Sequence, residues 1–537
     1  MKRIGVDAHC HIFNASDLPA AEFTATVVLG LDESLPPGLK HLAKALTKLA
    51  VKALSAPAPT GSEEIKILQG GSRGIQKALV ALSEIRSKHD WMVQLGGLLL
   101  EFRKSDDPHE RELAGLFMEE LGESLGTAGT ESLKLLNGAD FLSAPFLPLA
   151  NSGLRGAWDW IRATHEFLWF LRCHRYSNGR KMISLYGGEG RVNLIAPALI
   201  DYEFWLRKRK NDSDTMDTRT PLEDQLKVMQ VVNQKSGGRI HAYAPYDPLR
   251  DVEQNGRALR VAQEAVRKYG FIGVKLYPPM GFQAWGNEGK DFYLPGGSGN
   301  TSDKKWRKSL GKELDASLRR LYEWCVAEDV PILVHTNSSV LSRSDYADRP
   351  NPKYWGELLE KSGIPGIENL RVLMGHFGGF GDENPDPKTA KEKARNKQIQ
   401  EWSGEIIRLC LKFPNIYADI SYHDAVLEGD TRTRYAASLK KILSGATSAM
   451  RRKLCYGSDW VMLARQPGNE FYRDRMEDVM AKDIGLSPQE TADVMGHNAL
   501  RFLGLTGSLQ GVNRLEEFYQ KNKLRTPVWS KDARSLK

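Results

Sequence analysis

Eight short apolar runs, each followed by a stretch of helical periodicity, constrain the fold of this chain more than any other feature. The runs are KRIGVDAH (2–9), VNLIAPALI (192–200), RIHAYAPY (239–246), FIGVKLY (271–277), PILVHTN (331–337), LRVLMGHFG (370–378), NIYADISY (415–422) and KLCYGSDW (453–460). Strands that are apolar almost throughout and alternate with helices indicate a parallel sheet buried on both faces. Eight such units predict an α/β fold of the (β/α)8 TIM-barrel type, with its last helix within 487–505.

One interval breaks this rhythm. The first run ends near His11 and the second begins near Val192, far more than a barrel repeat needs. Apolar residues recur at three- and four-residue spacing within this interval, in 38–54, 74–86, 110–125 and 156–174. We therefore expect a large helical insertion after strand one, at the C-terminal face of the barrel. A lid, a partner-binding subdomain and a simple packing appendage are equal alternatives for it.

These patterns predict three parts of the chain. The barrel domain comprises 1–29 and 181–505, the helical insertion comprises 30–180, and a basic C-terminal tail comprises 506–537. The net charge of +8 invites a nucleic-acid partner, but the basic residues are spread along the chain and match no nucleic-acid-binding motif. We therefore expect a small-molecule partner rather than a nucleic acid, and we leave a homo-oligomer open.

The cysteines and the apolar stretches indicate the compartment. The five cysteines are scattered and form no C-x-x-C motif, which favours a reducing compartment over a disulfide framework. The chain opens on Met1-Lys2-Arg3 without an apolar signal region, and no apolar stretch reaches the ~18 residues that span a bilayer. We therefore expect a cytoplasmic protein without a membrane partner.

Two histidines end the first run, in the stretch GVDAHCHIF. His9 and His11 are one residue apart, so along a strand they project from the same face. Cys10 projects from the other face, and we discount it as a ligand. Taken alone, the pattern fits a metal-binding pair and a polar strand end equally well.

Other polar side chains lie at or just after later runs. They are Lys275 in the fourth run, His335 in the fifth, His376 in the sixth and Asp459 in the eighth. Because the C-terminal ends of barrel strands meet at one rim, we expect these side chains to converge with the two histidines. Imidazole and carboxylate ligands suit Zn²⁺, with Mn²⁺, Fe²⁺ or Co²⁺ as alternatives.

The chain resembles the amidohydrolase superfamily. The motifs that carry the resemblance are DAHCHIF, VKLYPP, PILVHTN, VLMGHFGG, NIYADIS, YGSDW and GHNALRFLGL, in family order from residue 5 to about 505. Within the superfamily the chain is similar to the amidohydrolase-related branch, which includes aminocarboxymuconate-semialdehyde decarboxylase and related benzoate-type decarboxylases. The insertion is much larger than the loop of a compact family member, so no particular substrate is carried over.

The resemblance implies a set of metal ligands: His9, His11, His335 and Asp459. It implies that His376 is a further ligand or an acid/base group beside the metal. Lys275 occupies the place of the bridging carbamylated lysine of two-metal relatives, but we favour one metal, as is usual in this branch.

The expected activity follows from these ligands. Metal-activated water would attack a C–N or C–O bond of a small anionic substrate, with Asp459 taking the proton and His376 stabilising the oxyanion or protonating the leaving group. Lys275 and Arg250, in the stretch YDPLR, would pair with the anionic group. For Arg250 an ordinary structural salt bridge is an equal alternative. A non-oxidative decarboxylase or hydratase on the same site is the second hypothesis. A catalytically silent interaction platform is the third, and a complete ligand set argues against it.

Overall fold

The structure is a computed structural model of the 537-residue chain. It describes residues 3–18, 58–74, 169–188, 190–206, 219–293, 305–338 and 344–536, together with the single residues 76, 104, 111 and 167. Most of the predicted insertion, 30–180, lies outside the described residues, and so do its predicted helices 38–54 and 110–125 and most of 74–86 and 156–174.

Every strand of the structure lies within one of the eight predicted runs or overlaps its end. The strands are β1 (Gly5–Cys10), β2 (Val192–Pro197), β3 (Tyr243–Pro245), β4 (Gly273–Leu276), β5 (Ile332–His335), β6 (Val372–Gly375), β7 (Ile416–Asp419) and β8 (Leu454–Cys455). β1 pairs in parallel with β2, and β3 to β8 form a six-stranded parallel sheet in sequence order. The expected α/β class with parallel strands is confirmed.

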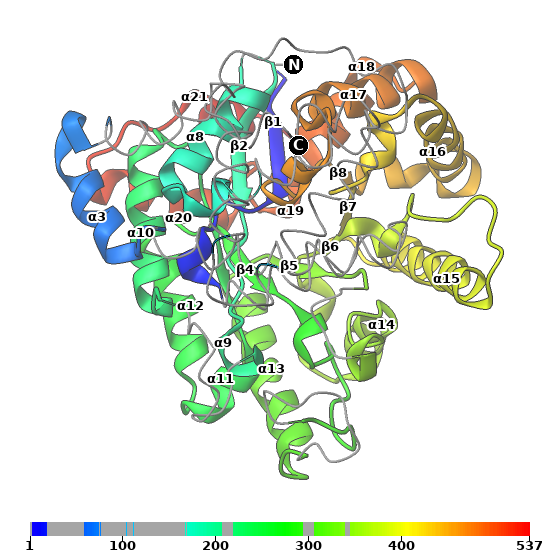
Figure 1. Cartoon of the computed structure of the whole chain (residues 1–537), viewed down its shortest axis with the longest axis horizontal. Coiled ribbons are helices and arrows are strands. Elements are labelled where there is room, and N and C mark those ends of the chain that lie inside the picture. The colour runs from blue at the N-terminus through cyan, green and yellow to red at the C-terminus, as the bar shows by residue number, and fades with distance from the viewer. Residues whose placement is uncertain are drawn as a thin grey trace.

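Backbone hydrogen bonds join the two sheets on both sides. Ile195 of β2 donates to the carbonyl of Arg239 at 2.9 Å, just before β3. On the other side, Ala8 of β1 donates to the carbonyl of Tyr456 at 3.0 Å, just after β8. β1 therefore lies between β2 and the end of β8, as Figure 1 shows.

Helices separate most of the strands along the chain. Their bounds are α3 (Gly61–Gln69), α8 (Arg175–Tyr186), α9 (Glu203–Leu206), α10 (Leu222–Lys235), α11 (Pro248–Glu253), α12 (Arg257–Lys268), α13 (Leu310–Ala327), α14 (Lys353–Lys361), α15 (Ala390–Lys412), α16 (Gly429–Ile442), α17 (Tyr472–Asp478), α18 (Pro488–Ala492), α19 (Asn498–Phe502), α20 (Gln510–Lys521) and α21 (Val528–Ala533). Capping boxes begin α15 at Thr389 and α18 at Ser487, which explains where these helices start. Among the described helices, none has the length and apolarity that a bilayer crossing requires.

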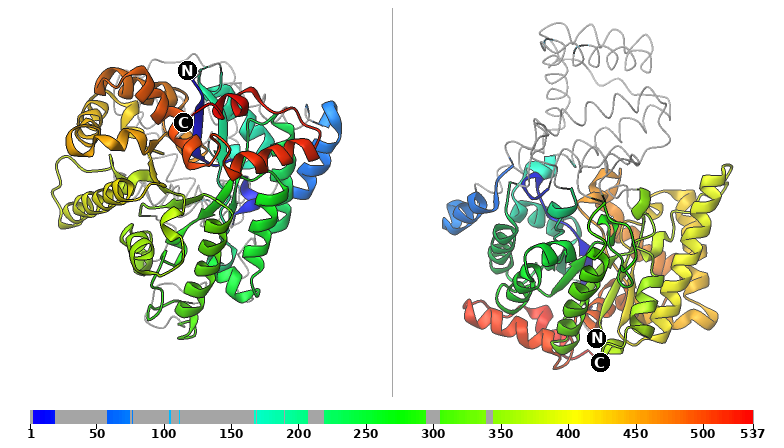
Figure 2. Two further views of the ribbon diagram at one scale, coloured as in Figure 1. Left: turned by 180° about the vertical axis from the view of Figure 1, so that it is seen from behind. Right: turned by 90° about the horizontal axis from the view of Figure 1, so that it is seen from below.

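The segment 506–537, expected as a basic tail, contains two packed helices. Phe518 of α20 and Trp529 of α21 are buried in the smaller of two apolar clusters, which also holds Val6 of β1 and Leu333 of β5. Figure 2 shows α20 and α21, in red, at the end of the molecule where both chain ends are labelled. The apolar positions of this segment, rather than its charges, decide its structure.

A shift of register in β1 sets the direction of its side chains. Val6 and Ala8 pack in the smaller cluster, whereas Cys10 packs in the larger one. The pairing of β1 with β2 shifts between Asp7 and Cys10, which is a β-bulge or equivalent irregularity. As a result Cys10 lies on the other side of β1 from Ala8 and His9. The sequence predicted this opposite orientation of Cys10 and His9.

Trp529→Ala tests the packing of the C-terminal helices. The indole is 5% exposed and its Nε1 donates to the carbonyl of Gly238 at 2.8 Å. We expect this change to lower the free energy of unfolding by about 3–5 kcal/mol, because a large buried side chain is lost. The neighbouring Val528 is 60% exposed, so Val528→Ala should change the free energy of unfolding little. Equal urea midpoints for the two variants would contradict the packed helix.

Candidate metal centre

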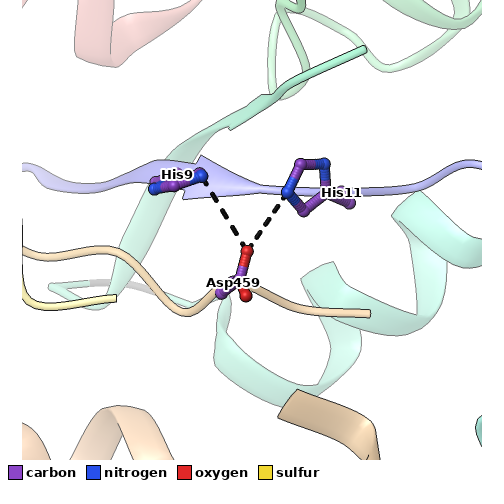
Figure 3. Close-up of side chains that lie close together, drawn as sticks. All are labelled: His9, His11 and Asp459. Atoms are coloured by element: carbon purple, nitrogen blue, oxygen red, sulfur yellow. Dashed lines mark ion pairs between the residues drawn. The ribbon is translucent and has the colours of Figure 1, made fainter. Parts of the chain in front are cut away.

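His9, His11 and Asp459 come together at the ends of β1 and β8. Nε2 of His11 is 3.1 Å from Oδ1 of Asp459, and Nε2 of His9 is 3.8 Å from the same oxygen. Figure 3 shows both rings, from one strand, turned toward this carboxylate. All three side chains are buried, and they form one of two groups among the described residues that could hold a metal ion.

The other ring nitrogen of each histidine has an acceptor. Nδ1 of His9 lies 3.0 Å from Oδ2 of Asp419, and Nδ1 of His11 lies 2.8 Å from the carbonyl of Ala198. Carbonyl and carboxylate oxygens only accept, so each Nδ1 carries a proton, and in a neutral ring Nε2 is then a lone pair. Burial, above all, lowers the pKa of His9 well below its ordinary value, so this ring is neutral.

This donor set fits a cation. The two lone pairs of His9 and His11 face the Oδ1 atom of Asp459, and three electron-rich atoms repel one another unless a positive charge lies between them. Burial raises the pKa of Asp459, but the neighbouring His11, His376 and His9 outweigh it, so the pKa lies below its ordinary value and the group is a carboxylate. Ligands of a tetrahedral ion are about 3.4 Å apart, which the two measured distances bracket.

His335 and His376 lie beside this cluster. Nε2 of His376 is 3.0 Å from Nδ1 of His335, and the ring centroids of His376 and His9 are 4.7 Å apart. Burial, above all, lowers the pKa of His335 well below its ordinary value. Nε2 of His335 is buried and has no hydrogen-bond partner in the part of the chain that the structure describes. His335 is therefore next to the cluster through His376 and is not one of its three grouped residues.

Lys275 contacts the cluster directly. Its Nζ lies 2.9 Å from Nε2 of His9, and the side chain is 1% exposed. Burial lowers the pKa of Lys275 to about 8. Because one lone pair serves one partner, the amine of Lys275 and a metal ion compete for Nε2 of His9.

Arg250 is not brought to the cluster. Its guanidinium pairs with both oxygens of Asp201 and, at 2.5 Å, with Oε2 of Glu203. Arg250 therefore forms the structural salt bridge that the sequence left as an alternative. Its two partners, Asp201 and Glu203, follow β2 in the chain.

Asp419 and Ser421, to which the sequence reasoning gave no role, stand between the histidines. Asp419 ends β7, and Ser421 follows two residues later. Oγ of Ser421 lies 3.0 Å from Nδ1 of His9 and 3.0 Å from Nδ1 of His376. The stretch NIYADIS could have indicated a site residue, because Asp419 lies at the end of a strand, as His335 does.

The backbone at these strand ends is strained. His376 (φ 62°), Phe377 (φ 46°), Tyr422 (φ 59°) and Asp459 (φ 54°) adopt left-handed conformations although none is glycine. Such residues cost on the order of 1–3 kcal/mol each and cluster at functional sites. The strain coincides with the residues that the sequence singled out after β6 and β8.

Comparison with known proteins identifies the larger part of this site. Residues 248–505 match the profile of the amidohydrolase family, and this range contains Lys275, His335, His376 and Asp459. The resemblance to the amidohydrolase family is thus shown over residues 248–505. The predicted resemblance, and the prediction of an enzyme of the amidohydrolase superfamily, are confirmed.

Three of the solved structures that are similar to this chain are enzymes of stated activity. One is 2,6-dihydroxybenzoate decarboxylase from Rhizobium, at 14% identity and a TM-score of 0.35, covering 61% of this chain and 87% of that one. Another is 4-oxalomesaconate hydratase from Rhodopseudomonas palustris, at 13% identity and a TM-score of 0.35. The match covers 76% of this chain and 95% of that one. A third is 5-carboxyvanillate decarboxylase from Novosphingobium aromaticivorans with bound manganese, at 14% identity and a TM-score of 0.34. The match covers 76% of this chain and 93% of that one. None of the curated proteins compared with the chain matches it.

Arg250→Met tests whether this arginine is structural. Removing one partner of a buried ion pair leaves the other uncompensated, so we expect the free energy of unfolding to fall by about 3–5 kcal/mol. Arg257→Met is the matched control, because Arg257 is 45% exposed in its pair with Glu223 and such pairs contribute about 0–1 kcal/mol. Urea unfolding of both variants measures the difference. If Arg250→Met is as stable as the control, Arg250 is free for substrate.

Proposed function

We propose that the chain is a metal-dependent hydrolase of the amidohydrolase superfamily, built on a closed (β/α)8 barrel. The hydrogen bonds on both sides of β1 support closure of the barrel. The domain division proposed from the sequence is kept, with the barrel at 1–29 and 181–505 and the insertion at 30–180. The observation that carries the function is that the Nε2 atoms of His9 and His11 both face the carboxylate of Asp459.

The residues that would hold one divalent ion are His9, His11 and Asp459. His335 is the proposed fourth ligand, because its buried Nε2 has no partner among the described residues. When bound, such an ion supplies a Lewis acid that polarises a carbonyl and makes water acidic enough to react near neutral pH. Zn²⁺ is our first choice for this donor set, with Mn²⁺, Fe²⁺ and Co²⁺ as alternatives.

The chain's own side chains would then handle protons and charge. Asp459 is ionised and lies at the cluster, so it takes the proton of the attacking water. His376, whose Nε2 is 3.0 Å from Nδ1 of His335, stabilises the developing oxyanion or protonates the leaving group. Lys275, the buried cation beside His9, pairs with an anionic group of the substrate. Arg250 has no part in this proposal.

The second candidate is a non-oxidative decarboxylase or hydratase on the same residues. The observation that favours it is the buried amine of Lys275 at 2.9 Å from Nε2 of His9, which can hold a substrate carboxylate next to the cluster. A screen of the metal-loaded protein separates the two. Amides and esters would release an amine or an alcohol with a hydrolase, whereas carboxylic acids would release CO₂ with a decarboxylase. The cytoplasmic location, a homo-oligomer and a protein partner bound by 30–180 stay predictions.

Metal content is the first test. Protein purified without chelators should carry about one divalent ion per chain, measured by elemental analysis. His11→Ala should lose most of it, whereas His241→Gln should retain it, because His241 is engaged by the carbonyl of Gly270 and by Tyr519. Two ions per chain with a carbamylated Lys275 would replace the one-metal proposal. If the protein binds no metal even after divalent ions are added, both the one-metal and the two-metal proposals are wrong.

Asp459→Asn separates binding from chemistry. The amide keeps one oxygen ligand but removes the negative charge, so much of the metal should stay while the rate falls by about 10²–10⁴-fold. His9→Ala should lose metal and rate together, with partial recovery of both on added metal. The measurement is turnover of a substrate found in the screen, together with metal content. Near wild-type turnover of Asp459→Asn would remove Asp459 from the proposal.

A further inference from the structure

The carboxylate of Asp419 is fully buried at the end of β7 and is surrounded by donors. Oδ1 accepts from the backbone N–H of His376 at 2.9 Å, from the backbone N–H of Ser421 at 3.1 Å and from Oγ of Ser421 at 2.5 Å. Oδ2 faces Nδ1 of His9 at 3.0 Å. A carboxylate only accepts hydrogen bonds, so Asp419 dictates where each neighbouring proton lies.

The direction of the hydrogen bonds continues through Ser421. Its single hydroxyl proton is donated to Asp419, so Oγ of Ser421 can only accept from Nδ1 of His376, 3.0 Å away. The backbone carbonyl of Ser421, 3.2 Å from the same Nδ1, also only accepts. In the neutral ring of His376 the proton is therefore on Nδ1, and Nε2 is a lone pair.

His335 is the last ring of this chain. Because Nε2 of His376 is an acceptor, Nδ1 of His335 donates to it across 3.0 Å. Nε2 of His335 is then also a lone pair, and it is the buried nitrogen that has no partner among the described residues. One carboxylate thus orders the protons of three rings in a single direction.

We propose that Asp419 is a positioning residue that fixes the tautomers of His9, His376 and His335, acting on the last two through Ser421. Its effect is that the bare Nε2 atoms of His9 and His335 are available to a metal ion. That consequence rests on the proposed function, whereas the order of the protons does not.

Asp419→Asn keeps the size of the side chain but introduces an NH₂ group that donates. His9 then loses the carboxylate that accepts its Nδ1 proton, which favours the other tautomer, with a proton on Nε2 that blocks ligation. Loss of such a supporting carboxylate costs about 10–100-fold in metal affinity, and we expect that loss here. Ser421→Ala removes the hydroxyl that contacts Nδ1 of both His9 and His376, but it keeps the carboxylate of Asp419 on His9 and the backbone carbonyl of residue 421 on His376, so it should change the tautomers less than Asp419→Asn does.

The experiment uses the full metal-free chain labelled with ¹⁵N-histidine. The ring nitrogen shifts report the tautomer, and single His→Gln variants assign the signals. The wild type should show the proton on Nδ1 of His9, His376 and His335. In parallel, Co²⁺ is titrated into each variant and followed by its visible absorption. Asp251→Asn is the matched control, because Asp251 is an equally buried carboxylate that accepts from Ser317 and Arg320 instead.

The outcomes separate this proposal from the proposed function. A wild type that binds no Co²⁺ ends the metal-dependent function, yet the tautomer shifts in Asp419→Asn would still support the positioning role. Unchanged tautomers and unchanged Co²⁺ affinity in Asp419→Asn would overturn it, as would equal losses in Asp251→Asn. If Asp419→Asn does not fold, Asp419→Ala decides: an unchanged tautomer of His9 together with an unchanged Co²⁺ affinity in that variant would overturn the proposal.

Discussion

The shift of register between β1 and β2 is the constraint on which the rest of the site depends. Val6 and Ala8 pack inside, and strict alternation along the strand would bring Cys10 inside as well. His9 and His11 would then point at the helices. The shift reverses the phase within a few residues, so a strand that begins as apolar core ends as a pair of imidazoles facing the ends of the other strands.

Burial removes charged and polar groups from water at several places in this structure, and the groups that replace the water differ from place to place. The carboxylate of Asp419 is satisfied by four donors, and the guanidinium of Arg250 by two carboxylates. Nε2 of His335 is left without a partner among the described residues, and an unsatisfied buried acceptor costs about 1–3 kcal/mol. The left-handed backbone at His376 and Asp459 adds to that cost at the same place. Stability elsewhere in the fold therefore supports an unfavourable arrangement at the strand ends.

The sequence predicts those parts of the molecule that repeat a simple pattern. The eight strands were predictable because buried parallel strands are apolar throughout, and His9, His11 and Asp459 because strand ends carry the polar residues of such folds. Asp419 has the same position, but its role depends on the contact with His9, 410 residues away in the chain, which no local pattern reveals. The partners of Arg250 also come from another loop. In 506–537 the apolar positions were visible, but their charged neighbours suggested a tail. The predicted insertion lies mostly outside the described residues.

The packing of α20 and α21 against β1 has a consequence for how the molecule acquires its structure. Val6 is synthesised long before Phe518 and Trp529, which share its cluster. The smaller core therefore cannot be completed on the ribosome before residues 512–536 emerge. Contacts of such high sequence separation slow folding, and the incomplete core exposes apolar surface meanwhile. That surface is covered only when α20 and α21 dock against β1.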